Sequence, residues 1–247
     1  MSTAPRILVI IPAFNEARSI GQVIGDIPAA LVEEVVVVNN ASTDETEANA
    51  RAAGATVLRE PRRGYGRACL RGIAYAREKN PDLVVFLDGD YSDHPEEMSD
   101  LVAPILRGEA DFVVGSRMRG RREPGAMLPQ ALLGNRLACF LMRLLWGARY
   151  TDLGPFRAIR FADLLALGME DETFGWTIEM QIKAVLAGLR YTEVPVSYRR
   201  RVGVSKITGT VSGTVKASAK ILWTIAKYGI KARRVRRPVF EKSASGL

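Results

Sequence analysis

Residues 83–90 are Leu83-Val84-Val85-Phe86-Leu87-Asp88-Gly89-Asp90, five apolar residues followed directly by two carboxylates with one glycine between them. A continuous apolar run of this length is typical of a strand that is buried on both faces in a parallel sheet. Such sheets bind their ligands beyond the carboxyl ends of the strands. Because alternate residues of an extended chain point to the same side, we expect Asp88 and Asp90 to face one site.

The Asp88-Gly89-Asp90 triplet has two interpretations. Two carboxylates on one side of a strand end repel each other unless a cation lies between them. Mg²⁺ or Mn²⁺ would suit this position, since both prefer oxygen ligands and commonly bind substrate phosphates as well. Gly89 would let the backbone pass close to a ligand. The alternative is a solvated turn after a buried strand, because Asp and Gly are common turn residues.

The first half of the chain alternates strands and helices. Apolar runs at 6–11, 34–38 and 55–59 precede the central strand, and helical patterns follow them at about 17–27, 44–53 and 67–79. This alternation predicts an α/β fold with a mostly parallel sheet and helices on both faces. The polar loops after the strands should therefore converge on one cleft. These loops are residues 12–16, 39–44, 62–67 and 88–93.

The second half is expected to add a strand at about 111–115, a turn and short strand within 150–160, and a last strand at about 189–198, with helices between them. Arg199 to Lys206 is a basic loop, and an amphipathic helix rich in Lys and Arg follows it. We therefore predict one domain over residues 1–210 and a basic C-terminal helix and tail over residues 211–247.

Charge and composition restrict the class of protein. The 247 residues carry a formal net charge of +8, which favours an anionic partner such as a nucleotide, a phosphate or an anionic lipid. Cys69 and Cys139 lie far apart without metal-type spacing, so we expect two reduced core thiols. The segment Met1 to Pro5 is short and polar, which gives no sign of a signal peptide. We expect a cytoplasmic protein that can associate with the inner face of the membrane.

Known nucleotide-binding loops do not account for the pattern. Gly64-x-Gly66 follows the third strand rather than the first and lacks a final glycine, and there is no GxxxxGK[ST] loop. We therefore expect neither a nicotinamide dehydrogenase nor a P-loop enzyme. Backbone amides near Gly64 could still approach a phosphate at the helix start.

Six short motifs occur along the chain in a fixed order. Together they resemble those of inverting family 2 glycosyltransferases of the GT-A fold, and most closely those of dolichyl- and polyprenyl-phosphate sugar synthases. They are Ile10-Ile11-Pro12-Ala13-Phe14-Asn15-Glu16, Val37-Val38-Asn39-Asn40-Ala41-Ser42-Thr43-Asp44, Leu87-Asp88-Gly89-Asp90 with His94-Pro95-Glu96, Gly115-Ser116-Arg117, Gly154-Pro155-Phe156-Arg157 and Gly203-Val204-Ser205-Lys206.

The resemblance implies a metal-dependent enzyme that moves a hexose from a UDP- or GDP-sugar to an acceptor, with a polyprenyl or dolichyl phosphate favoured. The triplet Asp88, Gly89 and Asp90 corresponds to the DxD motif, which holds the metal and the ribose-diphosphate. Residues matching the nucleoside site are Pro12, Phe14, Glu16, Val38 and Asn40. Residues matching the phosphate-binding positions are Arg117, Arg200, Arg201, Ser205 and Lys206.

This chain departs from the family pattern at three places. Asn39 and Asn40 stand where the family usually has Asp, so the preference for a nucleotide base stays open. One extra residue precedes His94, and we favour Asp93 as the third metal ligand beside the DxD carboxylates. Finally, many relatives carry C-terminal membrane spans, and no apolar run in this sequence is long enough for one.

The acceptor determines whether a catalytic base is needed. A polyprenyl phosphate is largely ionised near neutral pH, with a second pKa of about 6, and could attack the anomeric carbon without one. A hydroxyl acceptor would need a carboxylate, for which Glu179 and Asp152 are the candidates. Glu179 could instead be a surface residue paired with Lys183 one helical turn away. We interpret His94 as a structural residue.

Two basic amphipathic segments, 132–146 and 216–237, fit docking on an anionic membrane, with Trp146 and Trp223 at the interface. The alternative is that both helices simply cover the sheet with their apolar faces. Three other classes of protein are less consistent with the sequence. The intact pair of Asp88 and Asp90 argues against a non-catalytic nucleotide-sugar-binding protein. The absence of a Gly-rich basic loop after the first strand argues against a nucleotidyltransferase, and the absence of an aromatic stacking platform argues against a nucleic-acid binder.

Overall fold

The strands form one sheet in the computed structural model, which describes residues 4–203 and 211–235. Within these residues the strand order is β3-β2-β1-β4-β6-β5-β7, and β6 runs antiparallel to both of its neighbours. The predicted mostly parallel sheet is therefore confirmed, with the central apolar run as β4 beside β1. The strands are β1 (Ile7–Ala13), β2 (Glu34–Asn39), β3 (Thr56–Arg59), β4 (Leu83–Phe86), β5 (Phe112–Ser116), β6 (Arg157–Arg160) and β7 (Tyr191–Pro195).

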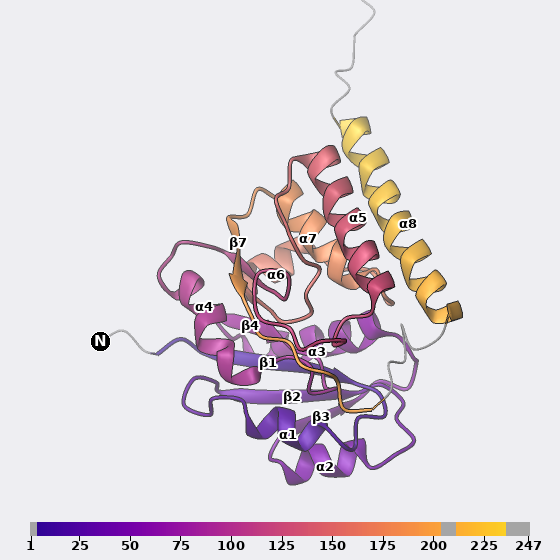
Figure 1. Cartoon of the computed structure of the whole chain (residues 1–247). Coiled ribbons are helices and arrows are strands. Elements are labelled where there is room, and N and C mark those ends of the chain that lie inside the picture. The colour runs from indigo at the N-terminus through magenta and orange to yellow at the C-terminus, as the bar shows by residue number, and fades with distance from the viewer. Residues whose placement is uncertain (1–3, 204–210, 236–247) are drawn as a thin grey trace, which may run out of the picture.

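Helices cover both faces of the sheet (Figure 1). Ile7, Val9 and Ile11 of β1 pack with α1, α2 and α4, whereas Leu8 and Ile10 face the layer of α3, α5, α6, α7 and α8. Because both sides of the strand are covered, its apolar run is unbroken. The helices are α1 (Ile20–Gly25), α2 (Thr46–Ala52), α3 (Tyr65–Lys79), α4 (Met98–Leu106), α5 (Pro129–Trp146), α6 (Phe161–Leu167), α7 (Trp176–Leu186) and α8 (Val211–Val235).

Asp44 shapes the entry to the first two helices. Its Oδ1 accepts a hydrogen bond of 3.0 Å from the backbone amide of Thr46 at the start of α2. Its Oδ2 accepts a hydrogen bond of 3.2 Å from the amide of Ala17. Ala17 therefore stays in the loop, and α1 begins later than predicted.

Helices α5 and α8 lie side by side in the layer that rises above the sheet in Figure 1. Ile225 and Tyr228 of α8 are buried in the core that α5 and α7 also enter. α5 begins at Pro129, before the predicted Leu132, since proline is well suited to the first helical position. Across the described ranges, we find no helix with the length and apolar character that crossing a membrane requires.

Candidate active site

A cleft of about 340 Å³ opens at the carboxyl ends of β1, β2 and β4, where the strand-end loops were predicted to converge. We refer to it as the first cleft. Its walls come from the loops after β1, β2, β3 and β4, with contributions from the basic loop and the segment between α6 and α7. The predicted residues that line it are Pro12, Phe14, Glu16, Asn40, Asp88, Gly89, Asp90 and Arg201.

The two carboxylates of the triplet share this cleft, as predicted. Asp90 is only 2% exposed, and its Oδ1 accepts hydrogen bonds from the backbone amide and the hydroxyl of Ser92. Asp88 Oδ1 accepts a hydrogen bond of 3.0 Å from the hydroxyl of Tyr65. Burial raises the pKa of Asp88, an effect that the positive charge of Arg201 partly offsets. The site thus concentrates negative charge in a poorly solvated position.

Arg201 reaches into the first cleft from the basic loop and pairs with Oδ2 of Asp90. The amide of Val202 donates to the carbonyl of Asp90 at 2.9 Å, and the amide of Arg199 donates to the carbonyl of Ser92 at 2.9 Å. These bonds hold the basic loop along the segment that follows β4. The loop therefore delivers a cation to the carboxylates.

Arg200, also predicted for the phosphate site, points elsewhere. Its Nε donates to the carbonyl of Pro124 at 2.8 Å. Arg200 lines neither the first cleft nor a second cleft that adjoins it. Successive residues of an extended segment point to opposite sides, so Arg200 and Arg201 cannot both face the cleft. The predicted Ser205 and Lys206 lie outside the described residues.

Asp93 is the unusual carboxylate of the site. It is 1% exposed, and neither of its oxygens has a hydrogen-bond partner among residues 4–203 and 211–235. Burial, together with the charge of Asp88, raises the pKa of Asp93 to about 7. Such bare, hard oxygen donors suit Mg²⁺ or Mn²⁺.

The predicted metal ligands Asp88, Asp90 and Asp93 are nevertheless not arranged around one metal position in this structure. In the part of the chain that the structure describes, no group of three or more His, Cys, Asp or Glu side chains is arranged to hold a metal ion. The residues present fit a divalent ion that takes part of its coordination from a bound diphosphate, which is how Mg²⁺ is commonly held.

A second cleft of about 220 Å³ adjoins the first, and the two share Tyr65, Asp88 and Phe174 as lining residues. Its far wall is formed by the first turns of α5 and by Ser218 and Ile221 of α8. The carboxylate Asp88 therefore lies where two separate compounds could meet.

Arg117 lines the second cleft and is fixed by Asp152. Its Nε and NH2 atoms donate to the two carboxylate oxygens of Asp152 at 2.8 Å each, and its backbone amide donates to Oδ2 at 2.8 Å. Burial lowers the pKa of Arg117, but the charge and hydrogen bonds of Asp152 outweigh this, and the pKa lies well above its usual value. The guanidinium also lies 5.0 Å from the ring centre of Tyr198. Arg117 is thus a permanent, oriented cation.

The two amides that replace acids in the family pattern are used internally. Asn40 Nδ2 donates to the carbonyl of Arg62 at 2.8 Å, and its Oδ1 accepts from the amide of Gly64 at 2.8 Å. Asn39 Nδ2 donates to Glu47 Oε2 at 3.0 Å. Asn40 therefore organises the loop after β3, whereas Asn39 joins the end of β2 to α2. The amide of Gly64, predicted to approach a phosphate, is occupied by Asn40 instead.

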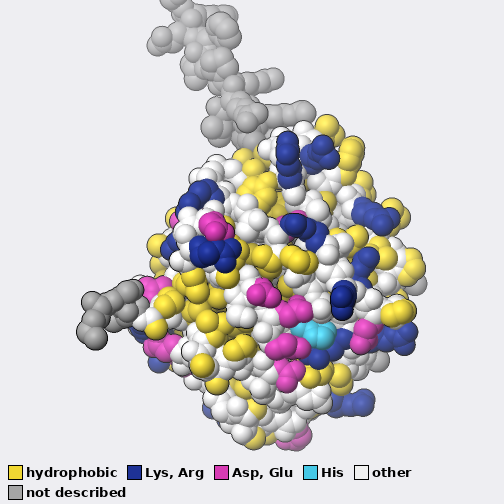
Figure 2. All heavy atoms as spheres, turned by 60° about the vertical axis from the view of Figure 1, so that its left-hand side comes forward, with side chains coloured by type: hydrophobic (Ala, Val, Ile, Leu, Met, Phe, Trp, Pro, Cys, Tyr) yellow, Lys and Arg dark blue, Asp and Glu magenta, His cyan; other side chains and the backbone are white. Residues whose placement is uncertain are grey.

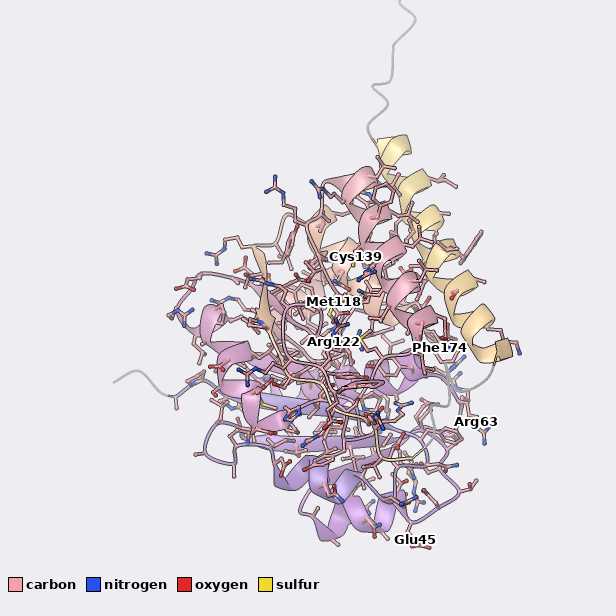
Figure 3. The ribbon with its side chains drawn as sticks, in the orientation of Figure 1. Glu45, Arg63, Met118, Arg122, Cys139 and Phe174 are labelled. Atoms are coloured by element: carbon pink, nitrogen blue, oxygen red, sulfur yellow. The ribbon has the colours of Figure 1, made fainter. Side chains whose placement is uncertain are left out.

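Three side chains of the first cleft were not among the predicted site residues: Arg63, Tyr65 and Phe174. Of these, Arg63 and Tyr65 lie in the loop 62–67 that was predicted to reach the cleft. The guanidinium of Arg63 lies 4.5 Å from the ring centre of Phe14, and both side chains line the first cleft. Phe174 lies beside the lower ends of α5 and α8, and Arg63 lies further down (Figure 3). The Gly64-Tyr65-Gly66 loop was a signal for Tyr65, whereas nothing in the segment 168–175 pointed to Phe174.

Close backbone packing explains the two glycines of that loop. A Cβ at Gly66 would overlap the carbonyl of Asp171, and one at Gly64 would overlap the carbonyl of Glu172. Gly64 also has a φ of +153°, which side chains rarely adopt. The absent side chains let the segment that carries Phe174 lie directly over the start of α3.

Two further predicted residues do not reach either cleft. Val38 is fully buried within β2, and its side chain belongs to the core and lines neither cleft. Glu179 is 1% exposed and accepts hydrogen bonds from the amide of Asp171 at 2.7 Å and the hydroxyl of Tyr228 at 2.7 Å. It pairs with Lys183 at 3.0 Å, as the alternative interpretation predicted, but inside the protein rather than on its surface. Glu179 is thus not placed to act as a base.

Comparisons with known proteins agree with this geometry. Residues 8–167 match the family described as glycosyl transferase family 2. An uncharacterized glycosyltransferase of Mycobacterium tuberculosis is 35% identical over 215 residues, covering 85% of this chain and 94% of that protein. Undecaprenyl-phosphate mannosyltransferase of Micrococcus luteus is 30% identical over 244 residues, covering 92% of this chain and 96% of that protein.

Solved structures share the fold. The crystal structure of glucosyl-3-phosphoglycerate synthase from Mycobacterium tuberculosis in complex with Mn²⁺ and uridine-diphosphate-glucose superposes with a TM-score of 0.72 at 25% sequence identity. The match covers 90% of this chain and 78% of that one. That enzyme's complex holds a metal ion and a nucleotide sugar together.

Proposed function

The chain belongs to glycosyl transferase family 2 and is a glycosyltransferase, and we propose that it transfers a hexose from a nucleoside diphosphate sugar to the phosphate of a lipid acceptor. The observation that carries the proposal is the meeting of two clefts at Asp88. A donor in the first cleft and an acceptor in the second would bring their reacting ends together there.

The first cleft suits the donor. Phe14 and Arg63 offer a flat surface for the base, and the carboxylates at the other end are of the kind that hold metal-bound diphosphates. Asp88 and Asp90 would hold the divalent ion, with Asp93 close behind them. When bound, the ion supplies positive charge to the departing diphosphate. Arg201 would then exchange its ion pair with Asp90 for contact with the diphosphate, which a planar guanidinium binds well.

The second cleft suits a phosphate acceptor. Arg117 presents a permanent cation whose direction is fixed by Asp152, and a bound phosphate would be oriented by it. Asp152 is fully buried and engaged with Arg117, and Glu179 is engaged with Tyr228 and Lys183. Neither candidate base is available, which favours an acceptor that needs none.

The proposed transfer is one displacement with inversion. An ionised phosphate oxygen of the acceptor forms the new bond to the anomeric carbon, while the bond from that carbon to the diphosphate oxygen breaks. The electron pair of the broken bond leaves with the nucleoside diphosphate. Holding both partners at Asp88 removes the entropic cost of bringing them together.

The test is transfer of a radiolabelled hexose from UDP-glucose or GDP-mannose to undecaprenyl phosphate in detergent with Mn²⁺, scored as label in the organic phase. We expect label with one donor, and loss of that label with Arg117→Ala or EDTA. A parallel reaction offers 3-phosphoglycerate, the acceptor type named for the solved relative. Label transferred only to that acceptor, in a product separated from the unreacted donor by anion-exchange chromatography, would contradict the lipid acceptor while leaving the glycosyltransferase assignment intact.

A further inference from the structure

The outer side of α5 carries an unbroken apolar stripe. Leu133, Leu137, Phe140 and Leu144 recur every three or four residues, which places them on one face of the helix. Their exposed fractions are 70%, 44%, 61% and 68%. Single exposed apolar residues are ordinary, but an aligned set of large ones indicates a contact surface.

The neighbouring helix α8 extends this surface. Leu222, Trp223 and Ile230 are 41%, 63% and 56% exposed, and α8 packs directly against α5. Trp146, which was predicted to lie at a membrane interface, is half-buried against the core, whereas Trp223, the other tryptophan predicted there, is exposed. We refer to the exposed apolar residues of the two helices as the docking face: Leu133, Leu137, Phe140, Leu144, Leu222, Trp223 and Ile230.

The charged side chains of the two helices that carry the docking face are all positive. Neither Pro129–Trp146 nor Val211–Val235 contains an Asp or a Glu. Arg136, Arg143 and Lys216 are exposed among the apolar residues. Two acidic residues that contact α8, Asp171 and Glu170, pair with Lys220 at 2.8 Å and Lys227 at 3.5 Å, so their charge is balanced there. Figure 2 shows a face on which several other acidic side chains gather around the histidine. An apolar surface studded only with cations is complementary to anionic lipid headgroups over acyl chains.

We propose that the docking face rests on an anionic lipid bilayer, with α5 and α8 lying in the interface. A second copy of the chain is a poorer occupant. A two-fold dimer through this face would bring Arg136 and Arg143 of both copies together without any acidic partner on either helix, and such like-charge contacts oppose association.

The position of the second cleft strengthens the proposal, which here rests on the proposed function. The second cleft is lined by residues of both docking helices: Gln130, Ala131 and Gly134 near the start of α5, and Ser218 and Ile221 of α8. A lipid whose tail stays in the bilayer could therefore present its phosphate to Arg117 without leaving the membrane. The bilayer is thus both the partner and the source of the acceptor.

The test is co-sedimentation of the full chain with vesicles of phosphatidylcholine, alone or with about 30 mol % phosphatidylglycerol. The proposal predicts binding to the anionic vesicles at low salt and weakened binding above about 0.5 M NaCl. Phe140→Glu with Leu144→Glu should reduce the bound fraction about 10-fold or more. Leu106→Glu is the matched control, since Leu106 is 45% exposed on α4, and it should bind as the unaltered protein does.

Three outcomes would overturn the proposal. They are no binding to anionic vesicles, equal binding by the Phe140/Leu144 variant, and a dimer in sedimentation velocity that the same variant dissociates. Circular dichroism of each variant confirms that its fold is kept. The vesicles contain neither donor nor acceptor, so failure here leaves the proposed transfer reaction untouched, and failure of transfer leaves vesicle binding untouched.

Discussion

Replacing Asp152 with Asn should destabilise the protein strongly, because it leaves a buried cation without its anion. Asp152 is fully buried, the Arg117 side chain is only 13% exposed, and three hydrogen bonds of 2.8 Å join the two residues. An amide has the same shape, but its NH₂ group would face a guanidinium donor. Breaking a buried pair from one side costs about 3–5 kcal/mol of unfolding free energy. With an m value of about 3 kcal/mol/M, the urea midpoint should fall by about 1 M or more.

Asp111→Asn is the matched control for that measurement. Asp111 also holds an arginine with both oxygens, at 2.6 and 3.0 Å, but the Arg190 side chain is 57% exposed. Water replaces the lost contact there, so the cost should stay below about 1 kcal/mol. Urea unfolding of both variants, followed by tryptophan fluorescence, gives the comparison. Equal losses in the two variants would refute the argument that burial makes the Arg117–Asp152 pair costly to break.

Three further predictions concern the first cleft. Tyr65→Phe removes the hydrogen bond to Asp88 and should lower the unfolding free energy by about 1–2 kcal/mol; an unchanged urea midpoint would contradict this. Arg201→Ala removes the cation paired with Asp90 and should tighten binding of Mn²⁺ alone, as measured by electron paramagnetic resonance; equal or weaker Mn²⁺ binding would contradict it. Burial raises the pKa of Asp93 to about 7, against about 3.9 in an unfolded chain. The protonated carboxyl therefore favours the folded state, and this contribution to the unfolding free energy is fully present below pH 4 and is lost as the pH rises through 7. Asp93→Asn should therefore stabilise the EDTA-treated protein relative to the unaltered one at pH 8 but not at pH 4, and an equal difference at both values would rule this out.

The sheet and its ligand edge could be predicted from the sequence because both depend on local patterns. A strand covered on both sides must be apolar throughout, and β1, β2 and β4 each show such a run. In a parallel sheet the loops after those strands meet at one edge, which is why Phe14, Asn40 and Asp88 could be placed in one cleft without a structure.

The rest depended on contacts between distant segments. Phe174 enters the cleft because residues 171–172 pass over Gly64 and Gly66, and no pattern in either segment announces the other. Arg201 faces Asp90 while Arg200 faces away, a difference of one position in an extended loop. Glu179 has the helical spacing of a surface residue, but α8 covers it through Tyr228, so its burial is set by packing alone.

The side-chain amides of Asn39 and Asn40 do not by themselves decide which nucleotide base the first cleft would prefer. Asn40 uses its side chain to bind Arg62 and Gly64 in the cleft wall, and Asn39 binds Glu47 outside the cleft. Under the proposed function, discrimination between uracil and guanine would therefore come from other groups that line the first cleft.

Isothermal titration with UDP, GDP, UDP-glucose and GDP-mannose, in Mn²⁺ and in EDTA, tests the central claim most directly. We predict binding of one base type that requires the metal and disappears in Asp90→Ala, while Asp111→Asn, outside the cleft, binds as the unaltered protein does. Binding that survives both EDTA and Asp90→Ala, or no binding of any of the four compounds, would contradict the account of the first cleft as a metal-dependent nucleotide-sugar site.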